Sequence, residues 1–210
     1  MYKVKVCGLM DTSCLQVLNE CLPDYAGFIL SPGFRRTVSP ERAAEIRAGL
    51  DGRIVTVGVF VDDDPARIAQ LYGRGIFGLV QLHGHEDEAY IDRLREVCPA
   101  PIAKAVGIRD GKVPKFPANC DYVLLDAYVA SGGGGTGKKV EWRPYPEIDR
   151  PFFLAGGITP DNVQEGLRAV RPCGVDTSGG VETDGKKDPR KIREYIMKAR
   201  EVRQEHYVKR

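Results

Sequence analysis

Residues 54–82, IVTVGVFVDDDPARIAQLYGRGIFGLVQL, hold a strand, a helix and a second strand in immediate succession. The run IVTVGVFV (54–61) is rich in β-branched residues and apolar enough to be covered on both faces. A helical pattern with a proline at its first turn follows over 63–75, and GLVQL (78–82) is the next strand. Strands joined through a helix run parallel, so this unit predicts an α/β fold with a parallel sheet.

The same alternation repeats along the whole chain. Further strand candidates are YKVKV (2–6), YAGFIL (25–30), PIAKAVG (101–107), DYVLL (121–125), PFFLA (151–155) and CGVDT (173–177). Ser39 and Thr159, each followed by a proline, are the expected caps of two intervening helices. Eight strands at roughly 25 residues per unit predict one (β/α)8 barrel domain over residues 1–210. An open doubly wound sheet is the alternative, but its GxGxxG fingerprint does not follow the first strand.

The glycine-rich stretch SGGGGTGKK, residues 131–139, is not a linker between two domains on this interpretation. It lies inside the connection between the sixth and seventh expected strands. Long glycine-rich connections of this kind are typical of functional loops, so we expect a mobile loop beside the active site.

Composition is that of an ordinary globular protein, with 42% hydrophobic and 29% charged residues. Lys+Arg 31 against Asp+Glu 29 gives a formal net charge of +2, which is too balanced for a nucleic-acid-binding surface. No apolar run reaches the length of a membrane span, and the N-terminus does not resemble a signal peptide. Six cysteines without a CxxC pair favour reduced thiols, so we expect a cytoplasmic location.

Polar residues and glycines follow the expected strands, at the end of the barrel where such folds place their active sites. These positions are Cys7-Gly8, Ser31 to Arg36, Asp62-Asp63, His83-Gly84, Asp126, Gly156-Gly157 and Ser178-Gly179-Gly180. LAGGIT follows the seventh strand and VDTSGG the eighth. Because glycines let backbone N–H groups approach an anion closely, this pair of loops predicts a phosphate site.

Cys7 and Asp126 end the first and the sixth strand, so both open into one funnel. Together they form a candidate acid/base pair, although a lone cysteine at a strand end is more often structural and a lone aspartate there often caps a turn. Arg35 and Arg36 supply positive charge that favours a thiolate, and an arginine fork suits a substrate carboxylate. His83 is a candidate base or a cap for the next helix. Metal binding is not expected there, because its loop offers no obvious thiol or third imidazole.

An ordered series of motifs runs from Tyr2 to about Ala199, nearly the whole chain. The series is VKVCG, GFILSPGFRRTVSP, VGVFVD, VQLHGHE, LLDAY followed by GGTGK, FLAGGITPDNV, and GVDTSGGVE with KKDPRKI. It resembles the phosphoribosylanthranilate isomerase family of tryptophan biosynthesis. Any single motif would be modest evidence, whereas the ordered series is specific.

The resemblance implies an intramolecular oxidoreductase that catalyses an Amadori rearrangement, the third step of the tryptophan branch from chorismate. N-(5-phosphoribosyl)anthranilate would become 1-(2-carboxyphenylamino)-1-deoxyribulose 5-phosphate. Asp126 matches the family's general acid, which would open the ribose ring. Cys7 matches its general base, which would remove the C2 proton. The resemblance implies no cofactor and no metal, because the substrate's own nitrogen serves as the electron sink.

The resemblance also implies binding residues. Arg36 matches the arginine that holds the anthranilate carboxylate, and His83 joins the substrate-binding residues. The phosphate would lie on Gly156, Gly157, Ser178 and Gly179. The family pattern usually reads two serines and then glycine, where this chain has Ser178-Gly179-Gly180, so one hydroxyl donor to the phosphate is expected to be missing. The implied partner is a small phosphoribosyl substrate, without nucleic acid or membrane, bound by a monomer or homodimer.

Two other functions remain as alternatives. A different phosphosugar barrel, such as an epimerase or a sugar-phosphate synthase, is expected to use other bases, often a lysine or a metal. A non-catalytic phosphate-binding barrel would need a lost acid or base. Cys7 and Asp126 are both present, which argues against each alternative.

Strand parity makes one prediction about the barrel interior. Because side chains alternate between the interior and the helix layer, a Cys7 at the mouth places Lys5 inside the barrel, while Val4 and Val6 face the helices. Asp176 has the matching parity on the eighth strand, which neighbours the first when the barrel closes. A buried lysine without a partner is costly, so we expect a Lys5–Asp176 ion pair. The alternative is that Lys5 reaches solvent or another acid.

Overall fold

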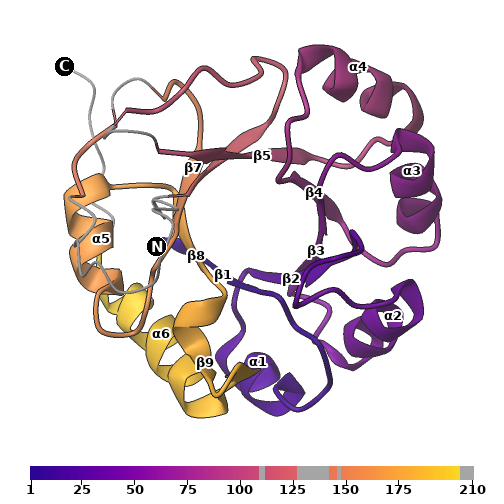
Figure 1. Cartoon of the computed structure of the whole chain (residues 1–210). Coiled ribbons are helices and arrows are strands. Elements are labelled where there is room, and N and C mark those ends of the chain that lie inside the picture. The colour runs from indigo at the N-terminus through magenta and orange to yellow at the C-terminus, as the bar shows by residue number, and fades with distance from the viewer. Residues whose placement is uncertain (109–111, 127–141, 146–147, 204–210) are drawn as a thin grey trace.

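The sheet closes into a barrel whose strands neighbour one another in chain order (Figure 1). The computed structural model describes residues 1–108, 112–126, 142–145 and 148–203. Its barrel strands are β1 (Lys3–Cys7), β2 (Tyr25–Ile29), β3 (Val55–Phe60), β4 (Leu79–Leu82), β5 (Ile102–Gly107), β6 (Tyr122–Asp126), β7 (Phe152–Ala155) and β8 (Gly174–Thr177). All eight neighbouring pairs, including β8 with β1, are parallel. The predicted (β/α)8 barrel is therefore confirmed.

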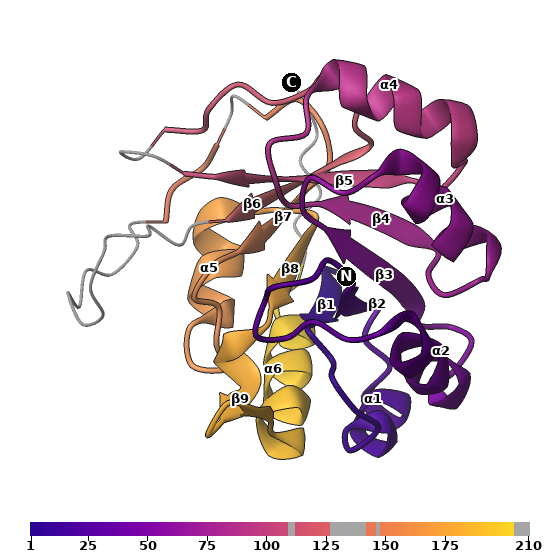
Figure 2. The ribbon, with the colours of Figure 1, turned by 45° about the vertical axis from the view of Figure 1, so that its right-hand side comes forward.

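Helices cover the outside of this ring (Figure 2). In the described part of the chain they are α1 (Leu15–Cys21), α2 (Pro40–Gly49), α3 (Pro65–Gly73), α4 (Glu88–Val97), α5 (Val163–Val170) and α6 (Pro189–Glu201). Between β5 and β6, residues 112–121 form no helix. The expected active-site loop at 131–139 lies outside the described residues, as does 204–210, so the extent of the domain over that end stays a prediction. No helix among the described residues is long and apolar enough to cross a bilayer.

Local capping explains where two of the helices begin. Ser39 caps α2 as predicted, since its hydroxyl accepts the backbone N–H of Arg42 at 3.1 Å. Thr159 makes the predicted capping contact, since its hydroxyl accepts the N–H of Asp161 at 3.2 Å and its carbonyl accepts that of Val163 at 3.0 Å, but the regular helix α5 begins only at Val163. The Asn162 side chain accepts the N–H of Thr159 at 2.8 Å and donates to the carbonyl of Gly157 at 2.9 Å. Together with the Thr159 contacts, these bonds form a capped turn over residues 159–162 that leads into α5.

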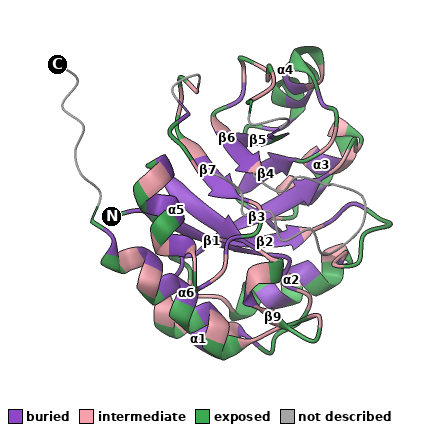
Figure 3. Ribbon diagram, turned by 60° about the vertical axis from the view of Figure 1, so that its left-hand side comes forward, coloured by how far each residue is buried: buried purple, intermediate pink, exposed green. Residues whose placement is uncertain are grey.

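Figure 3 shows that the barrel strands are largely buried, whereas the exposed residues lie on the helices and loops around them. Val4 and Val6 are fully buried in the large core cluster between the barrel and its helices. Inside the barrel the apolar side chains form two smaller clusters, Val57, Leu79 and Ala103 in one and Ala105, Leu124, Phe153 and Ala155 in the other. The barrel is therefore a packed core, and only its mouth is available for chemistry.

A short hairpin follows β8 and returns to the barrel mouth. A 3-10 turn, η1 (Gly179–Val181), leads into β9 (Glu182–Thr183) and antiparallel β10 (Lys186–Lys187). The connecting Asp184 and Gly185 both have positive φ, 51° and 76°, as a tight hairpin turn requires. The hairpin register sets Glu182 directly opposite Lys187.

Candidate active site

Cys7 stands at the C-terminal end of β1, with only 7% of its surface exposed. Its register partner on β2 is Gly27, where a Cβ would lie 2.7 Å from the Cys7 Sγ. Gly8 has a φ of 74°, and a Cβ there would lie 2.6 Å from Cδ of Arg36 and 2.8 Å from Oγ of Ser178. The two glycines therefore leave room for the thiol and for the arginine that crosses the end of β1.

Gly8→Ala is expected to lower both stability and substrate affinity, because its methyl group would displace Arg36. Gly75→Ala is a matched control, since Gly75 has a φ of 70° but a Cβ there would have no atom within 4 Å. The control should lose only the left-handed strain, roughly 1–2 kcal/mol in urea unfolding. Gly8→Ala should lose more and should also raise KM. Equal losses in the two variants, with KM unchanged, would contradict this account.

Asp126 ends β6, and its side chain is 27% exposed. Oδ2 of Asp126 lies 3.7 Å from Nε2 of His83, which follows β4. Two residues earlier, buried Gln81 places its Nε2 3.0 Å from Nδ1 of the same imidazole. Because an amide nitrogen only donates, Nδ1 accepts, and the proton of a neutral His83 sits on Nε2, facing Asp126. His83 is not a helix cap, since Asp87 caps α4.

Lys5 and Asp176 form the predicted ion pair beneath the mouth. Nζ of Lys5 lies 3.0 Å from Oδ2 of Asp176, and both side chains are less than a tenth exposed. Burial lowers the pKa of Lys5, but Asp176 and Cys7 outweigh it and hold that pKa above its ordinary value. Oδ1 of Asp176 has no hydrogen-bond partner among the described residues. Asp176 also interacts electrostatically with His83 and Asp126, so it links both sides of the mouth.

The two glycine-rich loops lie against each other. Gly156 and Gly157 after β7 both have positive φ, 82° and 69°. The Thr177 hydroxyl donates to the carbonyl of Ile158 at 2.6 Å, and a Cβ on Gly180 would fall 1.8 Å from the same oxygen. The packing of the two loops therefore requires a glycine at position 180. Gly179 is the residue that stands where the family pattern has its second serine.

Arg36 crosses from the loop after β2 to the hairpin after β8. Its Nε and Nη2 donate to the two carboxylate oxygens of Glu182 at 2.6 and 3.0 Å. Arg35 and Lys187 bind the same carboxylate at 2.6 and 2.9 Å. Burial raises the pKa of Glu182, but the three donors Arg36, Arg35 and Lys187 lower it to about 2. Lys187 also donates to the carbonyl of Ser178 at 2.8 Å.

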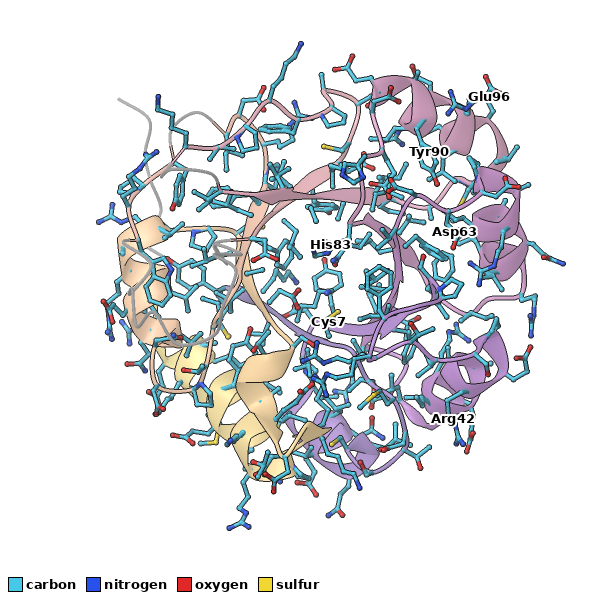
Figure 4. All side chains as sticks on the ribbon, in the orientation of Figure 1. Cys7, Arg42, Asp63, His83, Tyr90 and Glu96 are labelled. Atoms are coloured by element: carbon cyan, nitrogen blue, oxygen red, sulfur yellow. The ribbon has the colours of Figure 1, made fainter. Side chains whose placement is uncertain are left out.

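Other strand-end residues join neighbouring loops instead. Ser31 donates to Asp63 at 3.1 Å and accepts the N–H of Val61. Asp63 pairs with Arg67 in turn. Figure 4 shows Cys7 and His83 near the centre of the ring, and Asp63 farther out. Among the residues that the structure describes, no group of His, Cys, Asp and Glu could hold a metal ion.

Residues 4–198 match the family described as N-(5'phosphoribosyl)anthranilate (PRA) isomerase. This chain belongs to that family. The N-(5'-phosphoribosyl)anthranilate isomerase of Endomicrobium trichonymphae is 42% identical over 196 residues, 93% of this chain and 97% of the relative. The expectation of an isomerase of tryptophan biosynthesis is confirmed, and with it that of an intramolecular oxidoreductase.

Solved structures of the family agree with the barrel. The phosphoribosyl anthranilate isomerase of Thermotoga maritima superposes with a TM-score of 0.81 at 32% identity, covering 96% of this chain and 100% of its own. A second isomerase, solved in complex with reduced 1-(o-carboxyphenylamino)-1-deoxyribulose 5-phosphate, has a TM-score of 0.77 at 28% identity with the same coverage. These neighbours share the whole fold, not a fragment.

Three residues at this mouth were not predicted from the sequence. Gln81 had a usable signal, because it is a polar residue on the interior parity of a strand and two positions before His83. Glu182 and Lys187 had one as well, because Asp184-Gly185 between VET and KK is a hairpin signal that sets the two opposite each other.

Proposed function

We propose that this protein converts N-(5'-phosphoribosyl)anthranilate into 1-(2-carboxyphenylamino)-1-deoxyribulose 5-phosphate, with Asp126 as general acid and Cys7 as general base. One observation carries these roles. The Lys5–Asp176 pair interacts with Cys7 through Lys5 and with Asp126 through Asp176, so acid and base face one mouth. The reaction adds a proton to the ribose ring oxygen and removes one from C2. It therefore requires an acid and a base that both reach the bound substrate.

The reaction then runs in three proton steps. Protonated Asp126 gives its proton to the ribose ring oxygen, and the bond from C1 to that oxygen breaks to leave a Schiff base. The Cys7 thiolate takes the proton from C2, and the electron pair moves through C1 to the substrate nitrogen. The resulting enolamine gains a proton at C1 and loses the C2 hydroxyl proton, which gives the ketone. The Lys5 ammonium interacts electrostatically with Cys7, so a cation lies beside the proposed base.

The other residues of the mouth bind and orient the substrate. His83 directs its Nε2 proton at Asp126 and would hold that carboxyl in place. Backbone N–H groups around Gly156, Gly157, Ser178 and Gly179 would hold the phosphate. The complex of a related isomerase with a reduced product analogue supports a ligand of this class. Arg36 would take the anthranilate carboxylate.

A fluorescence assay tests the function. The anthranilate group makes the substrate fluorescent, so turnover should appear as a decay of that fluorescence on addition of the purified protein. Product should accumulate in proportion to the decay. Absence of decay with this substrate, under conditions where the protein is folded, would refute the proposed reaction.

Arg36→Met is expected to weaken binding of the carboxylate-bearing substrate. Loss of a charge-assisted bidentate contact costs roughly 1.5–3 kcal/mol, or about 10- to 150-fold in affinity. KM and the Kd of the reduced product analogue measure the loss. The same ligand without its carboxylate is the control and should bind both proteins alike. An equal loss for both ligands would show that Arg36 does not hold the carboxylate.

The cellular location and the oligomeric state of the enzyme are also proposed. All six cysteines are free thiols, which suits a reducing compartment, so we propose that the enzyme acts in the cytoplasm. The phosphoribosyl substrate is its proposed partner. Both a monomer and a homodimer fit the barrel, and the isomerase of Thermotoga maritima, described as dimeric with monomers generated from it, supports either state.

A further inference from the structure

Glu182 is the most heavily paired carboxylate at the mouth, and the reaction as proposed gives it no part. Its side chain is 7% exposed and binds Arg35, Arg36 and Lys187, which come from two different loops. Its own backbone carbonyl accepts Nζ of Lys191 on α6 at 2.7 Å. The carboxylate is therefore fixed from both ends, unlike an exposed ion pair whose side chains move freely.

Glu182 occupies one particular edge of the Arg36 guanidinium. A guanidinium carries five N–H donors in a rigid plane, and Glu182 takes Nε and one hydrogen of Nη2. Nη1 donates no hydrogen bond to any described residue, so one of its hydrogens and the second hydrogen on Nη2 form a free end-on edge. That edge can still hold a second carboxylate through two parallel hydrogen bonds.

The position of the guanidinium places this edge beside the reacting groups. Cδ of Arg36 packs over Gly8, the residue after Cys7, and Nη2 would lie 3.3 Å from a Cβ on Gly179 in the phosphate loop. Three cations face a single carboxylate here, so the cluster keeps a surplus of positive charge. A substrate anion between the base and the phosphate loop would therefore meet a donor edge that is both oriented and cationic.

We propose that Glu182 is a positioning residue for the isomerisation, holding Arg36 side-on so that its end-on edge receives the anthranilate carboxylate. Through Lys187, which also binds the carbonyl of Ser178, Glu182 fixes the spacing between the carboxylate site and the phosphate loop. The inference rests on the proposed function for the identity of the substrate. It adds a residue that acts through Arg36 and does not touch the substrate.

The test compares two ligands on two variants. Glu182→Gln keeps the size of the side chain but removes its charge. Glu20→Gln is the matched control, because Glu20 on α1 is also paired with an arginine, Arg193, but its side chain is 42% exposed and lies outside the mouth. The probes are the reduced 1-(o-carboxyphenylamino)-1-deoxyribulose 5-phosphate and the same compound without its carboxylate. KM and kcat with the true substrate are measured in parallel.

For Glu182→Gln we expect about a tenfold or larger loss of affinity for the carboxylated ligand, because an unanchored guanidinium must be ordered on binding. The ligand without a carboxylate should lose less than about threefold, and Glu20→Gln should stay within about threefold for both ligands. KM should rise more than kcat falls. A merely structural role would weaken both ligands equally, and that result would overturn the inference.

A double-mutant cycle tests whether Glu182 acts through Arg36. In an Arg36→Lys background, which lacks the planar fork, Glu182→Gln should cost little further affinity for the carboxylated ligand. Additive losses would overturn the inference. If Glu182→Gln does not fold, Glu182→Asp keeps the charge but withdraws it by one methylene, and the same ligand comparison decides. A wild-type protein without turnover refutes the proposed function, whereas an active wild type with an unaffected Glu182 variant refutes this inference alone.

Discussion

Cys7→Ala and Asp126→Asn are each expected to lower kcat by at least about 100-fold, the lower end of what a positioned acid or base contributes. Cys7→Ala removes the group that would take the C2 proton, and no other cysteine stands at the C-terminal end of a barrel strand. Asp126→Asn keeps the shape of the side chain but removes the proton that would open the ribose ring. Cys7→Ser should also be poor, because a hydroxyl is a much weaker base than a thiolate.

Two matched controls separate these roles from stability. Cys98→Ala removes a buried thiol at the end of α4, and Asp149→Asn changes a carboxylate whose side chain is 73% exposed. Both controls should keep near-normal turnover in the fluorescence assay. Near-normal turnover in Cys7→Ala would instead remove the thiol from the mechanism. Near-normal turnover in Asp126→Asn would show that Asp126 is not the general acid.

The barrel and most of its mouth were predictable because they follow from two regular features: side chains alternate along each strand, and strands alternate with helices along the chain. Alternation of side chains along a strand is fixed by backbone geometry, and barrel closure makes β1 and β8 neighbours. Those two rules were enough to pair Lys5 with Asp176, which are 171 positions apart in the chain. Residues at strand ends, such as Cys7 and Asp126, follow from the same logic.

Contacts made by long side chains between loops were not predictable in this way. Arg36 was expected to hold a substrate carboxylate, but its contact with Glu182 along one edge of the guanidinium was not predicted. Nothing in the strand pattern says that the hairpin after β8 returns to the loop after β2. The late start of α5 was not predictable either, because the side-chain bonds of Asn162 to Thr159 and Gly157 hold the first turn after the Thr159 cap outside the regular helix.

Lys5→Met is expected to destabilise the fold by roughly 3–5 kcal/mol, because it leaves the Asp176 charge buried without its partner. Urea unfolding measures this as a lower midpoint with an unchanged slope. Replacing both members, as in Lys5→Met with Asp176→Leu, should recover much of the loss, since an apolar pair leaves no unpaired charge.

Lys3→Met is the matched control, because Lys3 lies on the same strand and pairs with Asp24 at 2.7 Å from a side chain that is 55% exposed. An exposed pair of this kind contributes only about 0–1 kcal/mol.

The pH dependence of stability is a second, independent test of the Lys5–Asp176 pair. Because the pKa of Lys5 is raised in the folded protein, its contribution is fully present below its ordinary value of 10.5 and is lost as the pH rises through the higher folded-state value. As the pH rises above 10.5, the free energy of unfolding of the wild type should therefore fall more steeply than that of Lys5→Met. A Lys5→Met variant that costs no more than Lys3→Met, with the same alkaline limb as wild type, would show that the buried pair does not hold the barrel seam together.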